Sequence, residues 1–278
     1  MAILTSNMHT HSFFCDGEGW PEDYVRAALK KGFTDLGFSS HAPVPLETYW
    51  NMPEARAEQY VAHIRELQRK YAGQIRIYAG MEIDFFAGDR RGIFRRYDLD
   101  YTIGAVHFVE DKSGVSYTVD GSPEDFRDDM NRCTGGSIRQ YVTLYYDKVQ
   151  TMLRQERFDV LAHPDLIKRN NPGQCYFRED EAWYRKKVME TVGAIAACGR
   201  LAEVNTGGLA RGRADDIYPS AWIIREMKKQ NIPLTLNSDA HVPEQIDFYF
   251  PEAIQTIRAA GYREIWSYQD GKWVSNRI

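Results

Sequence analysis

The chain has 278 residues, of which 43% are apolar and 27% charged, and this balance is typical of a globular protein with a large buried core. Its net charge of −4 at pH 7 gives no excess of Lys and Arg for binding a nucleic acid or an anionic membrane surface. No apolar run is long enough to span a bilayer, and residues 1–6 lack the pattern of a signal peptide, so we expect a cytoplasmic protein with neither kind of partner.

Short apolar runs alternate with segments of helical periodicity along the whole chain. The first predicted strand covers residues 8–12 and precedes a predicted helix at 21–31, which has Pro21 in its first turn and Gly32 as its stop signal. The other predicted strands cover residues 35–41, 75–84, 101–109, 160–164, 201–206 and 234–238. The other predicted helices cover residues 53–71, 138–155, 179–198 and 219–230. Seven strands interleaved with helices indicate right-handed βαβ units and a parallel sheet, which is either closed as a barrel or open.

Two segments depart from this alternation. Residues 110–136 form a longer and more polar connection, which we expect to be an excursion or lid over one end of the fold. Residues 264–278 carry Asp270-Gly271 between apolar runs, and this pattern predicts a terminal hairpin. No shift in composition marks a boundary, so we predict a single domain spanning residues 1–278.

The cysteines are few and scattered. They are Cys15, Cys133, Cys175 and Cys198. Because they include no C-x-x-C pair, they match neither a disulfide framework nor a thiolate zinc site, and we predict free thiols.

Histidines concentrate at the ends of the predicted strands. Of the seven, only His63 falls within a predicted helix, where an ordinary structural role is expected. The other six lie at or just beyond the C-terminal end of a predicted strand, and they are His9, His11, His41, His107, His163 and His241. Ligands bind at these strand ends in parallel α/β folds. We therefore expect the six imidazoles to converge.

Three carboxylates, those of Asp16, Glu82 and Asp239, occupy equivalent places. Nine side chains of mixed nitrogen and oxygen type, without cysteine, exceed what one ion needs and suit two to three divalent ions such as Zn, Mn, Fe or Co. Asp165 follows His163 in H-P-D, where a carboxylate either orients the imidazole or caps a helix, and we expect the former.

The order of these motifs resembles that of a known family. H-T-H-S, S-S-H-A, G-M-E-I-D, G-A-V-H-F, A-H-P-D-L and N-S-D-A-H follow one another as in the PHP (polymerase and histidinol phosphatase) family. A-H-P-D-L-I-K-R, E-V-N-T-G-G-L and the excursion after G-A-V-H-F are similar to the stand-alone histidinol-phosphate phosphatase branch. The resemblance implies a distorted (β/α)7 barrel with its metal site at the C-terminal strand ends. It also implies metal-dependent hydrolysis of L-histidinol phosphate to L-histidinol and phosphate in histidine biosynthesis.

The resemblance further implies a trinuclear centre. Some family members have histidine where this chain has Asp16. One metal is expected to bind His9, His11, Glu82 and Asp239, a second to share Glu82 and add His107 and His163, and a third to bind Asp16, His41 and His241.

A cluster of cations suits phosphoester hydrolysis because it activates water and stabilises charge on the phosphoryl group. Glu82 is expected to bridge two metals, and Asp239 and His241 are both candidate proton donors to the leaving group. Arg169 and Arg211 follow the predicted strands and are candidate phosphate ligands, although a solvated charged face explains them equally well.

Further candidates near these motifs are less specific. Lys168 is a neighbouring phosphate candidate, and Gly207-Gly208 predicts either a close backbone approach to a ligand or a helix-entry turn. The ammonium and imidazole groups of histidinol phosphate require acidic or aromatic partners, for which Glu110, Tyr117 and Tyr218 are candidates.

Two other functions compete with this assignment. The first is a PHP phosphoesterase that acts on another small phosphorylated metabolite, a nucleotide or a DNA 3′ end, the last being disfavoured by the acidic net charge. The second is a non-catalytic, metal-stabilised binding domain, which is disfavoured because structural zinc sites are usually closed and rich in cysteine. The sequence sets neither the oligomeric state nor the metal.

Overall fold

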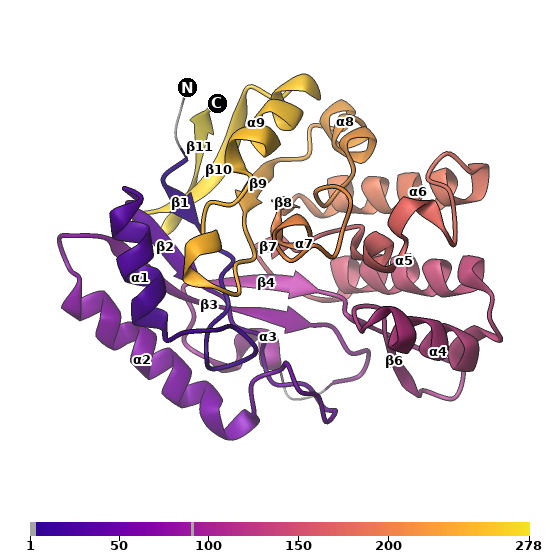
Figure 1. The fold of residues 1–278 in the computed structure, drawn as a ribbon, viewed down its shortest axis with the longest axis horizontal. Helices are drawn as coiled ribbons and strands as arrows, with labels where there is room; N and C mark the ends of the chain where they lie inside the picture. The colour runs from indigo at the N-terminus through magenta and orange to yellow at the C-terminus, as the bar shows by residue number, and fades with distance from the viewer. Residues whose placement is uncertain (1–3, 90–91) are drawn as a thin grey trace.

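The computed structural model describes residues 4–89 and 92–278, and its centre is a set of seven parallel strands (Figure 1). In sheet order these strands are β1 (Ser6–Asn7), β2 (Asp35–Phe38), β3 (Arg76–Asp84), β4 (Tyr101–Ala105), β7 (Val160–Leu161), β8 (Leu201–Asn205) and β9 (Leu234–Asn237). Each strand pairs with its neighbour in this order, from Ser6 opposite Asp35 to Asn205 opposite Asn237. The predicted parallel α/β architecture is therefore confirmed.

Among the residues that the structure describes, the first and last parallel strands meet only beyond their C-terminal ends. Beyond β1 and β9, Thr10 forms a parallel bridge with Ala240, and the backbone N–H of His11 donates to the Ala240 carbonyl over 2.9 Å. Before that bridge, the Met8 N–H donates to the Asn237 side chain over 2.8 Å instead of to a strand carbonyl. This partial closure is what distorts the predicted (β/α)7 barrel.

A hairpin extends the sheet beyond β9, as predicted. β10 (Glu264–Gln269) bridges β9 in parallel through Trp266 opposite Thr235, and it pairs antiparallel with β11 (Lys272–Arg277). Asp270 and Gly271 connect the two strands with φ angles of 49° and 74°, the left-handed conformation that a two-residue hairpin turn requires.

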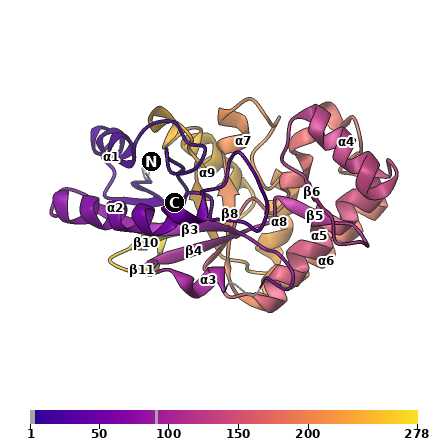
Figure 2. The same cartoon turned by 90° about the horizontal axis from the view of Figure 1, so that it is seen from below.

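Helices cover the outside of the barrel (Figures 1 and 2). Pro21 is the first residue of α1, and Glu22 and Asp23 lie in its first turn, at the positive end of the helix dipole. The Ser137 hydroxyl caps α5 by accepting from the Gln140 N–H. The longer covering helices are α1 (Pro21–Lys30), α2 (Ala57–Lys70), α5 (Ile138–Gln155), α6 (Ala182–Cys198), α8 (Ala221–Lys229) and α9 (Phe250–Ala259). Two single-turn helices, α3 (Ile93–Arg96) and α7 (Gly207–Ala210), lie in the connections.

The predicted excursion has its own structure and lies beside α5 (Figures 1 and 2). β5 (Phe108–Glu110) pairs antiparallel with β6 (Ser116–Thr118), and α4 (Pro123–Thr134) follows. Ser122 and Asp125 form a capping box at the start of α4, and Gly135 ends the helix with a φ of 63°.

Several strands are shorter than predicted at the end that carries the histidines. Residues 8–12 form only the bridge at Thr10, residues 101–109 divide into β4 and β5, and residues 160–164 contribute two strand residues. The backbone leaves the sheet at these points, and both His163 and Asp239 have positive φ angles, of 20° and 49°. Such turns direct the side chains into the barrel mouth instead of along the sheet faces.

The cysteines and the apolar character of the helices were also predicted from the sequence. All four cysteines are free, as predicted. Within residues 4–89 and 92–278, no helix is long and apolar enough to cross a lipid bilayer.

Candidate metal centre

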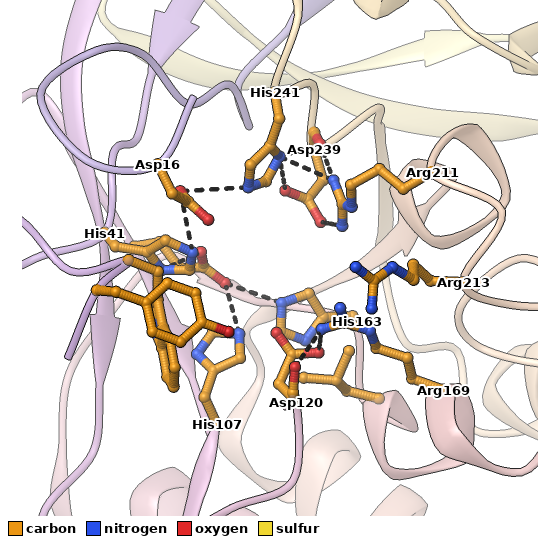
Figure 3. A pocket seen from close by; sticks show the side chains of 14 residues that line it. Asp16, His41, His107, Asp120, His163, Arg169, Arg211, Arg213, Asp239 and His241 are labelled. Atoms are coloured by element: carbon orange, nitrogen blue, oxygen red, sulfur yellow. Dashed lines mark hydrogen bonds and ion pairs between the residues drawn. The ribbon is translucent and has the colours of Figure 1, made fainter. Parts of the chain in front are cut away.

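All nine residues predicted as metal ligands gather at the C-terminal mouth of the barrel. Figure 3 labels six of them, which are Asp16, His41, His107, His163, Asp239 and His241. Most of them are buried, and the exceptions are Asp16, whose side chain is 30% exposed, and His241, which lies at the rim. The first and the last of them, His9 and His241, are more than 230 residues apart in sequence, so the barrel topology brings them together.

Glu82 lies at the centre of this group. It comes from β3, its side chain is 1% exposed, and five imidazoles surround its carboxylate. One oxygen, Oε2, lies 3.3 Å from His9 Nε2, 3.4 Å from His11 Nε2 and 3.0 Å from His41 Nδ1. The other, Oε1, lies 2.8 Å from His163 Nε2 and 3.6 Å from His107 Nε2. The carboxylate thus faces two separate groups of nitrogen donors.

Asp239 and Asp16 supply carboxylates nearer to solvent. Asp239 Oδ1 lies 3.0 Å from His11 Nε2 and 3.5 Å from His241 Nδ1. Asp16 Oδ1 lies 3.4 Å from His241 Nε2 and 3.9 Å from His41 Nε2. From the buried Glu82 to Asp16 at the rim, each carboxylate thus lies between imidazole nitrogens.

The donor atoms suit divalent cations. Nε2 of His9, Nε2 of His11 and Nδ1 of His41 are buried without a hydrogen-bond partner, although buried polar atoms normally have one. Four overlapping sets have donor atoms within 4.8 Å of one another, and they are His9-His11-Asp239, Glu82-His107-His163, His11-Asp16-His41-His241 and His41-Asp84-His107. Nitrogen and oxygen donors without sulfur fit Zn, Mn, Fe or Co.

Burial and neighbouring charges shift the pKa values of these groups in different directions. Burial alone favours neutral carboxyls, but the surrounding imidazoles, His9 foremost, hold the pKa of Glu82 well below its ordinary value. Burial and the nearby rings of His241 and His41 lower the pKa of His11 to about 3. The pKa of His107 is raised to about 9, since Asp84 and Glu82 outweigh the effect of burial.

Metal uptake is therefore expected to release protons. In the metal-free protein the pKa of His107 is raised to about 9, so this ring is protonated near pH 7.5, whereas a metal ligand must be neutral imidazole. Nearby carboxylates raise the pKa values of His9 and His41 as well. Zinc titrations by calorimetry in two buffers of different ionisation enthalpy should give different heats. The difference should correspond to the release of at least about one proton per chain. Heats that do not depend on the buffer would contradict this expectation.

Two buried carboxylates that the sequence reasoning missed orient the histidines. Glu203 on β8 accepts from His9 Nδ1 over 2.7 Å and also from Asn237 Nδ2 over 2.8 Å. Asp84, two residues after Glu82, lies 3.0 Å from His107 Nδ1. In both cases the carboxylate binds the Nδ1 side of the ring and leaves Nε2 directed at the cluster. The available signals were an acidic residue in the apolar 201–206 run and the strand spacing of Glu82 and Asp84.

Removing the charge of Glu203 should weaken the metal centre. Glu203→Gln replaces the carboxylate beside His9, and loss of such a supporting carboxylate typically costs about 10- to 100-fold in metal affinity. Competition with a chromophoric chelator measures this affinity. The matched control is Glu66→Gln, the same change on the exposed face of α2, which should leave metal affinity unchanged.

Both predicted arginines line the mouth. Arg211 donates to the Asp239 carbonyl over 2.6 Å and to Asp239 Oδ2 over 2.9 Å. Arg169 pairs with the carboxylate of Asp120. Burial and the charges of Arg211 and Arg213 lower the pKa of Arg169 to about 10. Arg213, which the sequence reasoning missed, also lines the mouth, so three guanidinium groups border it (Figure 3).

Two predictions about the H-P-D-L-I-K segment are wrong. Lys168 is buried away from the mouth, where it donates to the Ile217 carbonyl over 2.7 Å and to Ser220 Oγ over 2.6 Å. Asp165 accepts from the Ser220 N–H over 2.9 Å and pairs with Lys168 over 3.0 Å, instead of orienting His163. Asp165 and Lys168 thus hold Ser220, the residue that precedes α8.

The three candidates for binding the organic part of the substrate also lie outside the mouth. Glu110 pairs with Lys148 over 2.5 Å, Tyr117 donates to Asp111 over 3.2 Å, and Tyr218 is buried behind Gly208. The mouth is lined instead by Tyr49, Trp50, Asp120 and Leu166, together with the arginines and the candidate metal ligands.

The paired glycines bring two of the protein's own side chains close to the backbone. A Cβ atom on Gly207 would lie 2.8 Å from Asp239 Oδ2, and one on Gly208 would lie 2.5 Å from the Tyr218 ring. Both residues also open α7, so the helix-entry alternative holds.

Comparisons with known proteins agree with this geometry. The PHP domain pattern matches residues 7–207. A probable histidinol-phosphatase of Deinococcus radiodurans is 29% identical over 266 residues, covering 92% of this chain and 94% of the relative. The histidinol-phosphatase of Bacillus subtilis is 29% identical over 260 residues, covering 87% of this chain and 95% of the relative. The structure of histidinol phosphate phosphatase from Lactococcus lactis, complexed with Zn, L-histidinol and phosphate, has a TM-score of 0.71 at 18% identity and covers 98% of this chain and 100% of its own. This last likeness supports the barrel fold.

Proposed function

The chain belongs to the PHP domain family, and on that premise we propose that it is a metal-dependent phosphomonoesterase that hydrolyses L-histidinol phosphate to L-histidinol and phosphate. The observation that carries the proposal is the convergence of nine nitrogen and oxygen ligands around Glu82, next to three arginines that line the same mouth. The proposal places the enzyme in histidine biosynthesis, in the cytoplasm.

We propose that the centre holds two to three divalent ions. His9, His11 and Asp239 would hold one, with Glu82 shared. Glu82, His107 and His163 would hold a second, and Asp16, His41 and His241 would hold a third. When bound, such ions lower the pKa of water and stabilise charge on the transferred phosphoryl group.

The protein's own residues would position the ester and manage its charge. Arg169 and Arg211 would bind the phosphate oxygens, because guanidinium groups match phosphate geometry. Burial favours protonation of Asp239, but Arg211 and His9 hold its pKa well below the ordinary range, so it carries no proton at neutral pH. A carboxylate without a proton cannot protonate the leaving group, and this disfavours Asp239 in that role.

We also propose that residues 1–278 act as one domain. The matched family pattern ends at residue 207, but β9 lies beyond it and leads directly into Asp239 and His241. Without this last strand the barrel would lack both its closing bridge and two of its candidate ligands.

One assay tests the proposed function. Purified protein of known metal content is supplied with histidinol phosphate and a panel of other phosphomonoesters, and phosphate release is measured. We expect histidinol phosphate to have the highest kcat/KM. Preference for another ester would leave the phosphoesterase chemistry in place and remove the substrate assignment, whereas inactivity with every ester at full metal loading would favour a binding domain.

A further inference from the structure

Asp120 is an acidic side chain at the mouth of the barrel that belongs to none of the candidate metal sets. It lies in the excursion between β6 and α4 and lines the mouth with His163 and Arg169 (Figure 3). The other carboxylates that line this space are Asp16, Glu82 and Asp239, and all three are candidate metal ligands. Asp120 therefore needs a separate explanation.

The carboxylate of Asp120 is held in a fixed position with one oxygen unused. Arg169 pairs with Asp120 Oδ1 and also donates to the Asp120 carbonyl over 2.6 Å. The adjoining backbone is fixed by Thr118 Oγ1, which accepts from the Asp120 N–H over 3.1 Å, and by Asn170, which donates to the Gly121 carbonyl over 3.2 Å. Among the residues that the structure describes, no hydrogen bond or ion pair involves Oδ2, and the side chain is 21% exposed.

A carboxylate in this place opposes the binding of a simple phosphate. Arg169, Arg211 and Arg213 border the mouth and attract the anion, whereas Asp120 repels it and neutralises part of the charge of Arg169. Such an unfavourable charge makes physical sense where the correct ligand brings its own cation, because ligands that lack the cation are then rejected.

The position of Asp120 also suits the organic part of a substrate. With its phosphate bound at the metal cluster and the arginines, an ester must extend toward the other lining side chains, which are Asp120, Tyr49, Trp50 and Leu166. Of these, Asp120 is the one with a carboxylate, which only accepts hydrogen bonds and therefore suits an ammonium group, whereas the Tyr49 hydroxyl both donates and accepts and has no charge.

Building on the proposed function, we propose that Asp120 is a specificity-determining residue that accepts a hydrogen bond from the ammonium group of an amino-alcohol phosphate through Oδ2. Arg169 has a second role in this arrangement, because its pairing with Oδ1 sets the orientation of the carboxylate.

The test compares two substrates that differ only in the ammonium group. They are histidinol phosphate and the analogue in which hydrogen replaces the amino group, so that their leaving groups are both alkoxides. For Asp120→Asn we expect kcat/KM to fall about 10- to 100-fold with histidinol phosphate, the range for a hydrogen bond between charged groups, and to change little with the analogue. L-Histidinol should likewise lose potency as a competitive inhibitor, while the product of the analogue should not.

The control is Asp128→Asn, which removes an exposed carboxylate from the same excursion. It should leave both substrates unaffected, and thermal unfolding should show that both variants are folded. An equal loss on both substrates would mean that Asp120 acts only by holding Arg169 or by donating a proton, and no loss on either would mean that it has no role. Both results overturn the proposal.

Failure of the proposed function would be seen separately. In that case the wild-type protein would prefer an ester other than histidinol phosphate. The same comparison would then use O-phosphoethanolamine and ethyl phosphate, and an unchanged ratio of their kcat/KM values in Asp120→Asn would overturn the inference.

Discussion

Replacing Glu82 with glutamine is expected to reduce phosphate release on the order of 10³-fold and to lower metal occupancy at two positions. The change removes a negative charge that five imidazoles surround in a fully buried site. It also replaces one of two oxygen ligands with an amide nitrogen, which has no lone pair for a cation. Because Oε1 and Oε2 face different groups of nitrogens, one substitution should affect two metals.

Metal content by mass spectrometry and phosphate release on the same preparation measure this effect. The matched control is again Glu66→Gln, which makes the identical chemical change on the exposed face of α2. Thermal unfolding separates loss of metal from loss of fold. If Glu82→Gln kept both its full metal content and its turnover, Glu82 could not be the bridging ligand.

The candidate site was predictable from sequence because its ligands occur at the same position in successive units, just after a strand. Strand ends are visible as short apolar runs, and six histidines followed such runs. In a parallel barrel all these ends meet at one mouth, so their convergence follows from topology without knowledge of any distance. Glu82 and Asp239 were found for the same reason.

The residues that sequence reasoning missed act through contacts between distant segments. Glu203 orients His9 because β8 lies near β1 across the partly closed barrel, and no local pattern reports that contact. Asp120 reaches the mouth because the excursion folds back over it. Lys168 was misjudged for the converse reason, since a lysine adjacent in sequence to a site residue can have its side chain directed into the core.

Strand boundaries were also overestimated at the functional end. The sequence predicts a strand over residues 8–12, which contain His9 and His11. In the structure the ladder with β2 ends at Asn7, and the next backbone N–H, that of Met8, donates to the Asn237 side chain. Regular strand pairing ends where the ligand side chains turn into the mouth. The residues that mark the site therefore lie beyond the strand end, and the sequence pattern does not locate that end.

Removing the metals is expected to abolish activity and to destabilise the fold. A chelator should reduce phosphate release by at least about 10³-fold, and adding back Zn or Mn should restore it. Ligands that bind only the native state stabilise it by RT ln(1 + [L]/Kd), or about 4 kcal/mol at 1,000 times Kd, so the melting temperature should rise with free metal. His63→Asn, which changes a helical histidine outside the cluster, is the control and should respond to metal as the wild type does.

The stabilisation by metal should grow as the pH rises from 6.5 to 8.5. In the metal-free protein the pKa of His107 is raised to about 9, so its contribution to stability is complete below 6.5 and is lost as the pH rises through 9. The pKa of His11 is lowered to about 3, so its contribution is complete above 6.5 and is lost only as the pH falls toward 3. The metal-free form is therefore weakened at alkaline pH, where the metal-bound form gains because protons no longer compete for the imidazoles. Melting temperatures at both pH values, with and without Zn, measure the difference, and a gap that narrows at pH 8.5 would show that these imidazoles do not bind the metal.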